Sequence, residues 1–141
     1  MKNYISCKLI QAEPSIKDGV EGYSILYRDG YKSWCPKEQF EKANLQIDKN
    51  EKLASGVSIG EDMVKNFIKE YEVIERDNKT TIVYAKLVNG FTIVESSSCV
   101  DPANYVREIG VQVCLERIEN KIWELLGFML QTAFSGVKAD D

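Results

Sequence analysis

The sequence predicts an α+β fold, in which a small antiparallel β-sheet (a meander plus a hairpin) accompanies one long C-terminal helix used for oligomerisation. Three observations lead to this prediction. Turn-forming residues separate short apolar runs in the second half of the chain, and Asp29-Gly30 separates two aromatic-rich runs in the first half. Residues 106–131 repeat apolar side chains at helical spacing, and that helix has more apolar surface than one small sheet can cover.

Length and composition are typical of a globular protein that needs no disulfide or metal. The chain has 141 residues, of which 44% are hydrophobic and 28% charged. This length fits one domain, or one domain with a small appended lobe. The formal net charge of −4 disfavours a DNA or RNA polymer as partner, because nonspecific binding to nucleic acid needs a basic face. No apolar stretch is long enough to cross a membrane, so a membrane is not expected as a partner.

The chain contains no histidine, which removes the commonest general base and the commonest metal ligand. Walker-type loops and nucleophile elbows are absent from the sequence, and the four cysteines form no C-x-x-C pair. Glu95 and Asp101 are a candidate carboxylate pair, but a solvated strand end and a helix cap explain them better. We therefore expect a protein that is not an enzyme and has no catalytic residues, metal or cofactor.

The first 44 residues are expected to form a β-hairpin lobe with a short helix. Residues 4–10 alternate loosely and predict a first strand, whereas residues 14–22 have the composition of a loop. Pro36 occupies the position expected for the first residue of a helix that continues through residues 37–43.

The hairpin of this lobe pairs residues 22–28 with residues 31–35. Asp29-Gly30 predicts a two-residue turn, because these residues adopt the positive φ angles that such a turn requires. Four aromatic residues lie on the two strands: Tyr23, Tyr27, Tyr31 and Trp34. Cross-strand packing is the favoured interpretation of these rings, and a contact or stacking surface is the alternative.

A polar, lysine-rich linker is expected over residues 45–57, followed by a second lobe over residues 58–141. Ser58 and Glu61 have the spacing of a capping box, which predicts a helix start. The apolar face of this helix recurs at helical period: Met63, Val64, Phe67, Ile68 and Tyr71.

A β-meander is expected next, with strands over residues 73–76, 80–88 and 91–94. Asp77-Asn78-Lys79 and Asn89-Gly90 supply the two reversals. Three successive antiparallel strands are therefore predicted for this half.

Residues 95–105 are expected to form a polar hook, in which Asp101 caps the long helix with Pro102 at its first position. The helix, residues 106–131, carries two apolar stripes. The first comprises Val111, Leu115, Ile118, Ile122, Leu125 and Met129, and the second comprises Val106, Ile109, Val113, Leu126 and Leu130. One stripe is expected to pack on the meander and the other on a second copy, with burial inside one subunit as the alternative.

Seven residues around the hook are candidate ligand contacts: Phe91, Ser97, Ser98, Asn104, Tyr105, Arg107 and Arg117. Hydroxyl and amide groups donate to and accept from phosphates and base edges. Aromatic rings stack on a flat base, and the forked donors of arginine match a phosphate. Helix N-termini also attract anions through unpaired backbone N–H groups. The alternative for each arginine is an ordinary surface ion pair.

Several motifs in this half occur in a known order: NGF at 89–91, ESS at 95–97, VDPANY at 100–105, EIG at 108–110 and KIWELLG at 121–127. This order resembles a widespread family of small tailed-phage proteins named after gene product forty-nine of a podovirus, over about residues 58–131. That family includes the Thoeris anti-defence sponges, which sequester cyclic ADP-ribose isomers made by bacterial TIR enzymes. Some members also hold cyclic di- or trinucleotides. Residues 22–43, with the pattern DGYKSW-PKE-F, resemble another phage-encoded segment.

The resemblance implies a non-enzymatic sponge in the host bacterial cytoplasm, built as a homodimer or as a hexamer of dimers with pockets between subunits. It assigns the aromatic contact to Phe91, polar contacts to Ser97, Ser98 and Asn104, and basic contacts to Arg107 and Arg117. One departure is that many relatives carry a basic residue after EIG, where this chain has Val111. Arg28 or Arg76 would be the replacement.

Two alternatives accompany this interpretation. A protein-binding phage inhibitor or assembly factor would act through the aromatic hairpin. A cyclic-nucleotide hydrolase is less favoured, because the chain lacks the usual histidines.

Overall fold

The computed structural model describes residues 1–140; residue 141, the last of the expected second lobe, lies outside the described part. The chain forms two compact units, one of Met1–Ile47 with the chain from Phe128 onward and one of Asp48–Gly127. The elements follow in the order β1 (Gln11–Lys17), β2 (Val20–Leu26), β3 (Lys32–Pro36), α1 (Lys37–Ala43), α2 (Glu61–Asn66), β4 (Ile68–Arg76), β5 (Thr80–Leu87), β6 (Thr92–Ser98), the 3-10 helix η1 (Pro102–Asn104) and α3 (Arg107–Ser135). This is the predicted α+β class.

The second unit, Asp48–Gly127, contains the predicted meander: β4, β5 and β6 are antiparallel neighbours in that order. Asp77 and Asn78 both have positive φ, 56° and 53°, in the three-residue loop that joins the paired residues Arg76 and Thr80. Gly90 takes a φ of 88° in the second reversal. The turn residues recognised in the sequence therefore set the order of this sheet.

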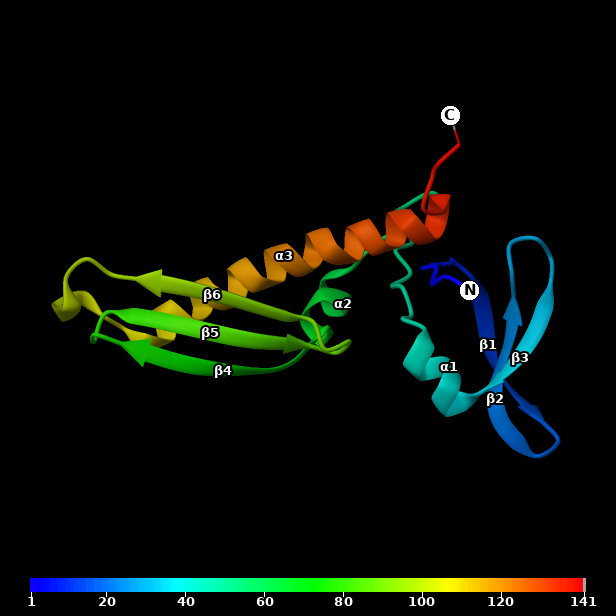
Figure 1. Cartoon of the computed structure of the whole chain (residues 1–141), viewed down its shortest axis with the longest axis horizontal. Helices are drawn as coiled ribbons and strands as arrows, with labels where there is room; N and C mark the ends of the chain where they lie inside the picture. The colour runs from blue at the N-terminus through cyan, green and yellow to red at the C-terminus, as the bar shows by residue number, and fades with distance from the viewer. Residues whose placement is uncertain (141) are drawn as a thin grey trace. The chain divides into compact units, whose positions relative to one another are not determined.

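The core of this unit lies between one face of the meander and α3, which runs along the sheet (Figure 1). Alternate β5 residues are buried, from Thr81 through Val83 and Ala85 to Leu87, because successive side chains of a strand point to opposite faces. The buried stripe of α3 is Cys114, Ile118, Ile122 and Leu126.

That stripe differs from both stripes expected in the sequence and takes members from each. Its members are four residues apart throughout, and such a row is inclined to the helix axis. An inclined row stays in contact with a twisted sheet, whereas a straight heptad seam does not.

The helix expected to start at Ser58 is shorter than predicted. Gly60 is the N-cap, α2 ends at Asn66, and Ile68 already belongs to β4. Tyr71 consequently pairs with Ala85 of β5 instead of lying on a helical face. Residues 68–76 mix apolar and charged side chains in a pattern that fits both a helix and a strand. They form a strand because they pair with β5.

In the first unit, β1, β2 and β3 form an antiparallel sheet. The first strand lies at Gln11–Lys17, so the prediction of a strand over residues 4–10 and a loop over residues 14–22 was wrong. Asp18 and Gly19 have φ of 51° and 77° and join Lys17 to Val20 in a tight turn. The mixed charge and glycine that suggested a loop mark a hairpin turn instead.

The hairpin between β2 and β3 is confirmed, but its loop is longer than two residues. Tyr27 and Tyr31 close a three-residue loop in which Gly30 alone has positive φ, 92°. This is the common three-residue alternative to the expected turn. Pro36 precedes α1 as its N-cap instead of being its first residue.

The ring of Tyr23 stacks on Phe40 of α1 with centroids 4.2 Å apart, and its hydroxyl donates to Glu41 at 2.8 Å. The Trp34 indole donates to Ser15 Oγ at 3.1 Å. These two of the four hairpin aromatics therefore contribute to internal packing.

Arg28 and Leu9 hold the end of α3, whose residues from Phe128 belong to the first unit. Arg28 Nη1 donates to the Phe134 carbonyl at 2.6 Å, and its guanidinium lies 4.9 Å from the Phe134 ring centre. The backbone N–H of Leu9 donates to the Ala133 carbonyl at 3.2 Å. Carbonyls at a helix C-terminus lack intrahelical donors, so these contacts stabilise it.

Only part of the expected hook is irregular. β6 continues through Glu95 to Ser98, and α3 starts at Arg107, after η1. Asp101 accepts a 2.9 Å hydrogen bond from the Ala103 N–H and therefore caps η1, not α3. Among the described helices, none combines the length and hydropathy that crossing a membrane requires.

Candidate functional site

A chain of hydrogen bonds at the start of α3 orders the candidate site. The Tyr105 hydroxyl donates to Glu75 Oε2 at 2.7 Å and lies 2.9 Å from Thr81 Oγ1. Because Tyr105 has one hydroxyl hydrogen and gives it to the carboxylate, Thr81 is the donor in the second contact. Arg107 Nε approaches Glu75 Oε1 at 3.5 Å. Glu75 therefore holds one aromatic candidate, Tyr105, and one basic candidate, Arg107.

The meander positions these groups through its register. Glu75 of β4, Thr81 of β5 and Ser97 of β6 lie directly across from one another, and cross-strand neighbours share a face of a sheet. Thr81 is fully buried beneath α3. Ser97, Tyr105 and Arg107 are thereby brought to one end of the sheet, on the face that α3 covers.

The electrostatics of Tyr105 reflect its two partners. The hydrogen bond from Thr81 lowers the pKa of the Tyr105 phenol, but burial and the adjacent Glu75 carboxylate raise it, and the net shift is upward. The phenol is consequently a donor at neutral pH. The side chain of Arg107 is 49% exposed, so part of its guanidinium faces solvent and can meet an anion.

Ser98 and Asn104, two of the predicted polar contacts, lie near this end of the sheet. Ser98 follows Ser97 on the strand and so points to the opposite face, where its hydroxyl is 2.6 Å from Thr80 Oγ1. Asn104 ends η1 and is exposed. The structure therefore does not direct Ser97 and Ser98 to the same ligand.

Arg117, the second basic candidate, lies three turns along α3 and reaches the edge of β6. Its Nη1 donates to the Ser96 carbonyl at 2.6 Å, and one turn later Lys121 forms an ion pair with Glu95. A cation bonded to a carbonyl of an edge strand shields that edge from pairing. In a single chain Arg117 thus has a structural partner.

Phe91, the second aromatic candidate, lies at the other end of the sheet. It follows Gly90 in the β5–β6 reversal and is 54% exposed. Ser97 lies six positions further along the extended chain, roughly 20 Å away at about 3.3 Å per residue. Figure 1 shows this reversal at the start of β6, whereas η1 follows the other end of the strand. One chain does not bring all seven candidates together.

The two arginines considered as replacements for Val111 each have a hydrogen-bond partner within their own unit. Arg28 belongs to the first unit, where it holds the end of α3, and Arg76 donates to the carbonyl of its neighbour Glu75. Val111 is half-buried.

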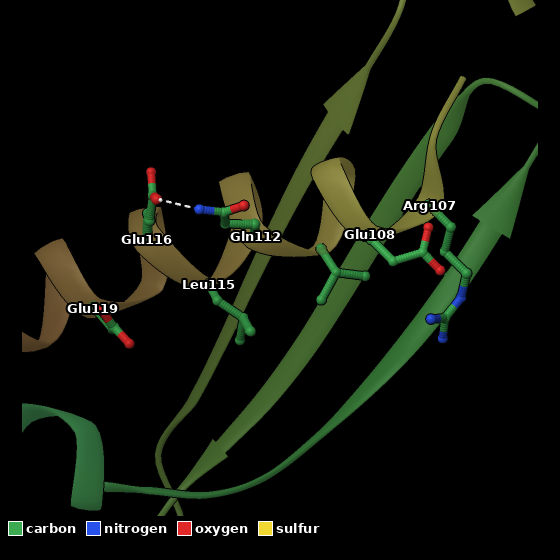
Figure 2. Close-up of a pocket in the computed structure, with 7 residues that line it drawn as sticks. Arg107, Glu108, Gln112, Leu115, Glu116 and Glu119 are labelled. Atoms are coloured by element: carbon green, nitrogen blue, oxygen red, sulfur yellow. Dashed lines mark hydrogen bonds between the residues drawn. The ribbon is translucent and has the colours of Figure 1, made fainter. Parts of the chain in front are cut away.

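A shallow groove along α3 was not predicted from the sequence. Figure 2 shows its lining, and its volume is about 350 Å3. All seven lining residues belong to α3: Arg107, Glu108, Val111, Gln112, Leu115, Glu116 and Glu119. The signal was present in the spacing of Glu108, Gln112, Glu116 and Glu119, which places these polar residues along one side of a helix.

The described residues include no cluster of three His, Cys, Asp or Glu side chains that could hold a metal. Hydroxyls, an ordered phenol and a half-exposed arginine lie together at the start of a long helix, and such groups can donate hydrogen bonds to an anion.

Fold and site together define a small α+β protein in which a meander and a long helix carry a polar patch. The chain belongs to the phage protein (N4 Gp49/phage Sf6 gene 66) family, whose model matches residues 59–134. The match covers the second unit almost entirely and extends to the last turns of α3. No curated protein and no solved structure matches the chain.

Proposed function

We propose that this phage protein is an anti-defence sponge, which binds a cyclic nucleotide immune signal and sequesters it without degrading it. The signal would be a cyclic ADP-ribose isomer or a cyclic di- or trinucleotide in the host bacterial cytoplasm. Membership of the phage family over residues 59–134 and the ordered motifs of residues 89–127 support this proposal.

The observation that carries the proposal is the ordered pair of Tyr105 and Arg107 on Glu75. Tyr105 is fixed by two hydrogen bonds, and Arg107 keeps about half of its side chain exposed. A cyclic nucleotide has flat bases and phosphates, which an aromatic ring and a guanidinium can recognise. Both groups lie at the start of a helix, where the backbone favours negative charge.

A second copy of the chain would complete the site. Phe91 lies roughly 20 Å from Ser97 along β6, too far for one nucleotide to touch both. In a dimer that packs two copies head to tail, the Phe91 end of one copy would meet the Tyr105 end of the other. We therefore propose a homodimer, or a hexamer built from such dimers, with ligands enclosed in the seams.

Sequestration requires tight binding. A dissociation constant on the order of 1 nM corresponds to about −12 kcal/mol. A preformed, enclosed seam reaches such affinity more readily than an open groove, because less ordering is needed on binding. A sponge needs no membrane and no nucleic-acid polymer as partner.

The direct test is a retention experiment. The protein is incubated with each cyclic nucleotide, separated from free ligand and heated, and the supernatant is analysed by mass spectrometry. Intact ligand is the expected result. A cleaved product would instead indicate a hydrolase, and no retained ligand for any candidate would contradict the proposal.

A matched pair of variants localises the site. Arg107→Glu should abolish retention, because it places a carboxylate beside Glu75 where the phosphate would bind. Arg76→Glu is the control, because its guanidinium contacts only the neighbouring carbonyl of Glu75. Arg117→Glu should also abolish retention while the protein stays folded; unchanged affinity would remove Arg117 from the site.

A protein-binding role through the hairpin is the alternative. Tyr23 and Trp34 already have partners in the first unit, and Tyr31 is the hairpin aromatic that is largely exposed, at 65%. Tyr31→Ala should therefore leave nucleotide retention unchanged. It would weaken only the binding of a partner protein to the hairpin.

A further inference from the structure

The groove along α3 has an apolar floor and an acidic rim. Val111 and Leu115, one helical turn apart, are the aliphatic residues of its lining and are both half-buried. Glu108, Glu116 and Glu119 lie along the rim, as Figure 2 shows. This combination of aliphatic and carboxylate side chains differs from the candidate nucleotide site and calls for a different occupant.

The rim carboxylates carry a largely uncompensated negative charge. The one basic residue of the lining, Arg107, is directed to Glu75. Gln112, a neutral residue, donates to Glu116 at 3.3 Å. The pKa of Lys65 of α2 is raised mainly by its ion pair with Glu61, at 3.0 Å, and only to a smaller extent by Glu119, so its ammonium group belongs to Glu61. The groove therefore attracts cations more than it attracts a phosphate.

We propose that this groove binds a basic, amphipathic helix of a partner protein. Two aliphatic residues on one face of such a helix would cover Val111 and Leu115. Lysines or arginines flanking that face would meet Glu108, Glu116 and Glu119. Laying the apolar face of a helix into a groove is a common mode of peptide recognition.

The length of the groove sets the length of the partner segment. Glu119 lies eleven positions after Glu108, which is roughly 16 Å at about 1.5 Å per residue of helix. A partner helix of about three turns matches this span.

A second copy of this chain fits the groove poorly. If two copies of α3 packed antiparallel through this side, Glu108 of one would lie opposite Glu119 of the other. In a parallel pairing, Glu116 would face Glu116. Like charges placed against each other across an interface disfavour association. The charge pattern thus selects a different, basic chain, and leaves other sides of α3 for self-association.

The test uses the full-length protein and a fluorescein-labelled synthetic peptide of about 12 residues, made of leucine and lysine with the leucines on one helical face. One comparison peptide replaces every lysine with glutamate. A second keeps the composition but distributes the leucines around the helix. Fluorescence anisotropy at physiological salt measures each dissociation constant. The amphipathic basic peptide should bind, and the two comparison peptides should bind at least about tenfold more weakly.

Variants then locate the binding surface. Glu108→Lys combined with Glu116→Lys should weaken binding of the basic peptide by roughly tenfold or more, because attraction becomes repulsion. Leu115→Ala should also weaken it, through the loss of apolar contact. Glu124→Lys is the matched control: it removes an exposed carboxylate of the same helix outside the groove and should leave the dissociation constant unchanged. Circular dichroism confirms that each variant is folded.

Three outcomes would overturn the proposal. The first is equal binding of the acidic peptide, and the second is equal binding of the peptide without an apolar face, which would show attraction to acidic surfaces in general. The third is a loss of affinity in Glu124→Lys as large as in the double variant. The double variant also separates this inference from the sponge proposal, since it should still retain a cyclic nucleotide.

Discussion

Tyr105 donates a 2.7 Å hydrogen bond to Glu75, and this contact joins the start of α3 to the edge strand β4. The same phenol oxygen accepts a hydrogen bond from Thr81, which is fully buried on the central strand. The residue that would stack on a ligand is therefore also the residue that fixes the helix on the sheet. Stability and binding should both depend on it.

Replacing Tyr105 with Phe should lower the thermal unfolding midpoint by a few degrees, because the buried Thr81 hydroxyl loses its acceptor. Differential scanning calorimetry measures the change. Adding Thr81→Val to Tyr105→Phe removes the unpaired hydroxyl and should recover part of the loss. Equal midpoints for the wild type and Tyr105→Phe would show that this network does not hold α3 in place.

The same contact predicts a loss of stability in alkali. The pKa of Tyr105 in the folded protein is raised above its ordinary value of 10.0, with the hydrogen bond from Thr81 opposing burial and Glu75. The neutral phenol is therefore favoured by folding. Its stabilising effect is fully present below pH 10.0 and is lost as pH rises through the higher folded-state pKa.

Urea unfolding of the wild type and of Tyr105→Phe at several pH values checks this sign. The stability difference between them should be constant at neutral pH and should shrink above pH 10.0. A difference that grows with pH would mean that folding favours the phenolate instead.

At Gly110, α3 approaches Thr81 of the sheet closely. A Cβ built on Gly110 would lie 2.8 Å from the Cβ of Thr81 and closer still to its hydroxyl oxygen. Gly110→Ala should therefore destabilise the protein by about 1–3 kcal/mol, because the helix must move away from β5. Urea unfolding measures this change.

Gly127 is the control on the same helix, because a Cβ there would meet nothing within 4 Å. Gly127→Ala should stabilise the protein by about 1 kcal/mol through helix propensity alone. If both substitutions stabilise, α3 is not packed against Thr81.

Local signals in the sequence were sufficient for the fold class, the hairpin and the order of the meander. Asp77-Asn78 and Asn89-Gly90 have the backbone preferences that their turns need, so they identify the strands on either side. The long helix was recognised because its period extends over many turns. Its observed end, Ser135, lies beyond the predicted one, since partners distant in sequence, Leu9 and Arg28, cap it.

Long-range pairing explains the other errors. The positions of Ile68 and Tyr71 in the sequence fit a helical face as well as a strand. Pairing with β5 places both residues in a strand. The first strand was placed at residues 4–10 because Asp18-Gly19 was interpreted as part of a loop.

The candidate site was predictable only in part. Tyr105 and Arg107 were chosen as candidates from their residue types and their position at a helix start, and the structure brings these two together on Glu75. Glu75, which orders both, was missed because it lies on another strand and nothing in its own neighbourhood indicates this role. Ser97 and Ser98 were grouped because they are adjacent in sequence, whereas strand alternation directs them to opposite faces.

Arg28→Ala should release the end of α3 in the first unit. The substitution removes the 2.6 Å hydrogen bond to the Phe134 carbonyl and the contact with the Phe134 ring. Hydrogen exchange of backbone amides in residues 128–135 should become faster, as expected for a frayed helix terminus. Arg76→Ala, which removes a guanidinium bonded only to a neighbouring carbonyl, should leave those amides unchanged. Equal exchange in both variants would mean that Arg28 does not stabilise the helix end.

The central claim, that two copies share each nucleotide site, is tested most directly by complementation between two inactive variants. Phe91→Ala and Arg107→Glu chains, carrying different affinity tags, are coexpressed, and the mixed oligomer is purified through both tags. Each variant alone should retain no cyclic nucleotide. The mixed oligomer should retain it, because one of its seams combines an intact Phe91 with an intact Arg107. A mixed oligomer that retains no more ligand than its parents, or a protein that binds the nucleotide as a monomer, would contradict the account.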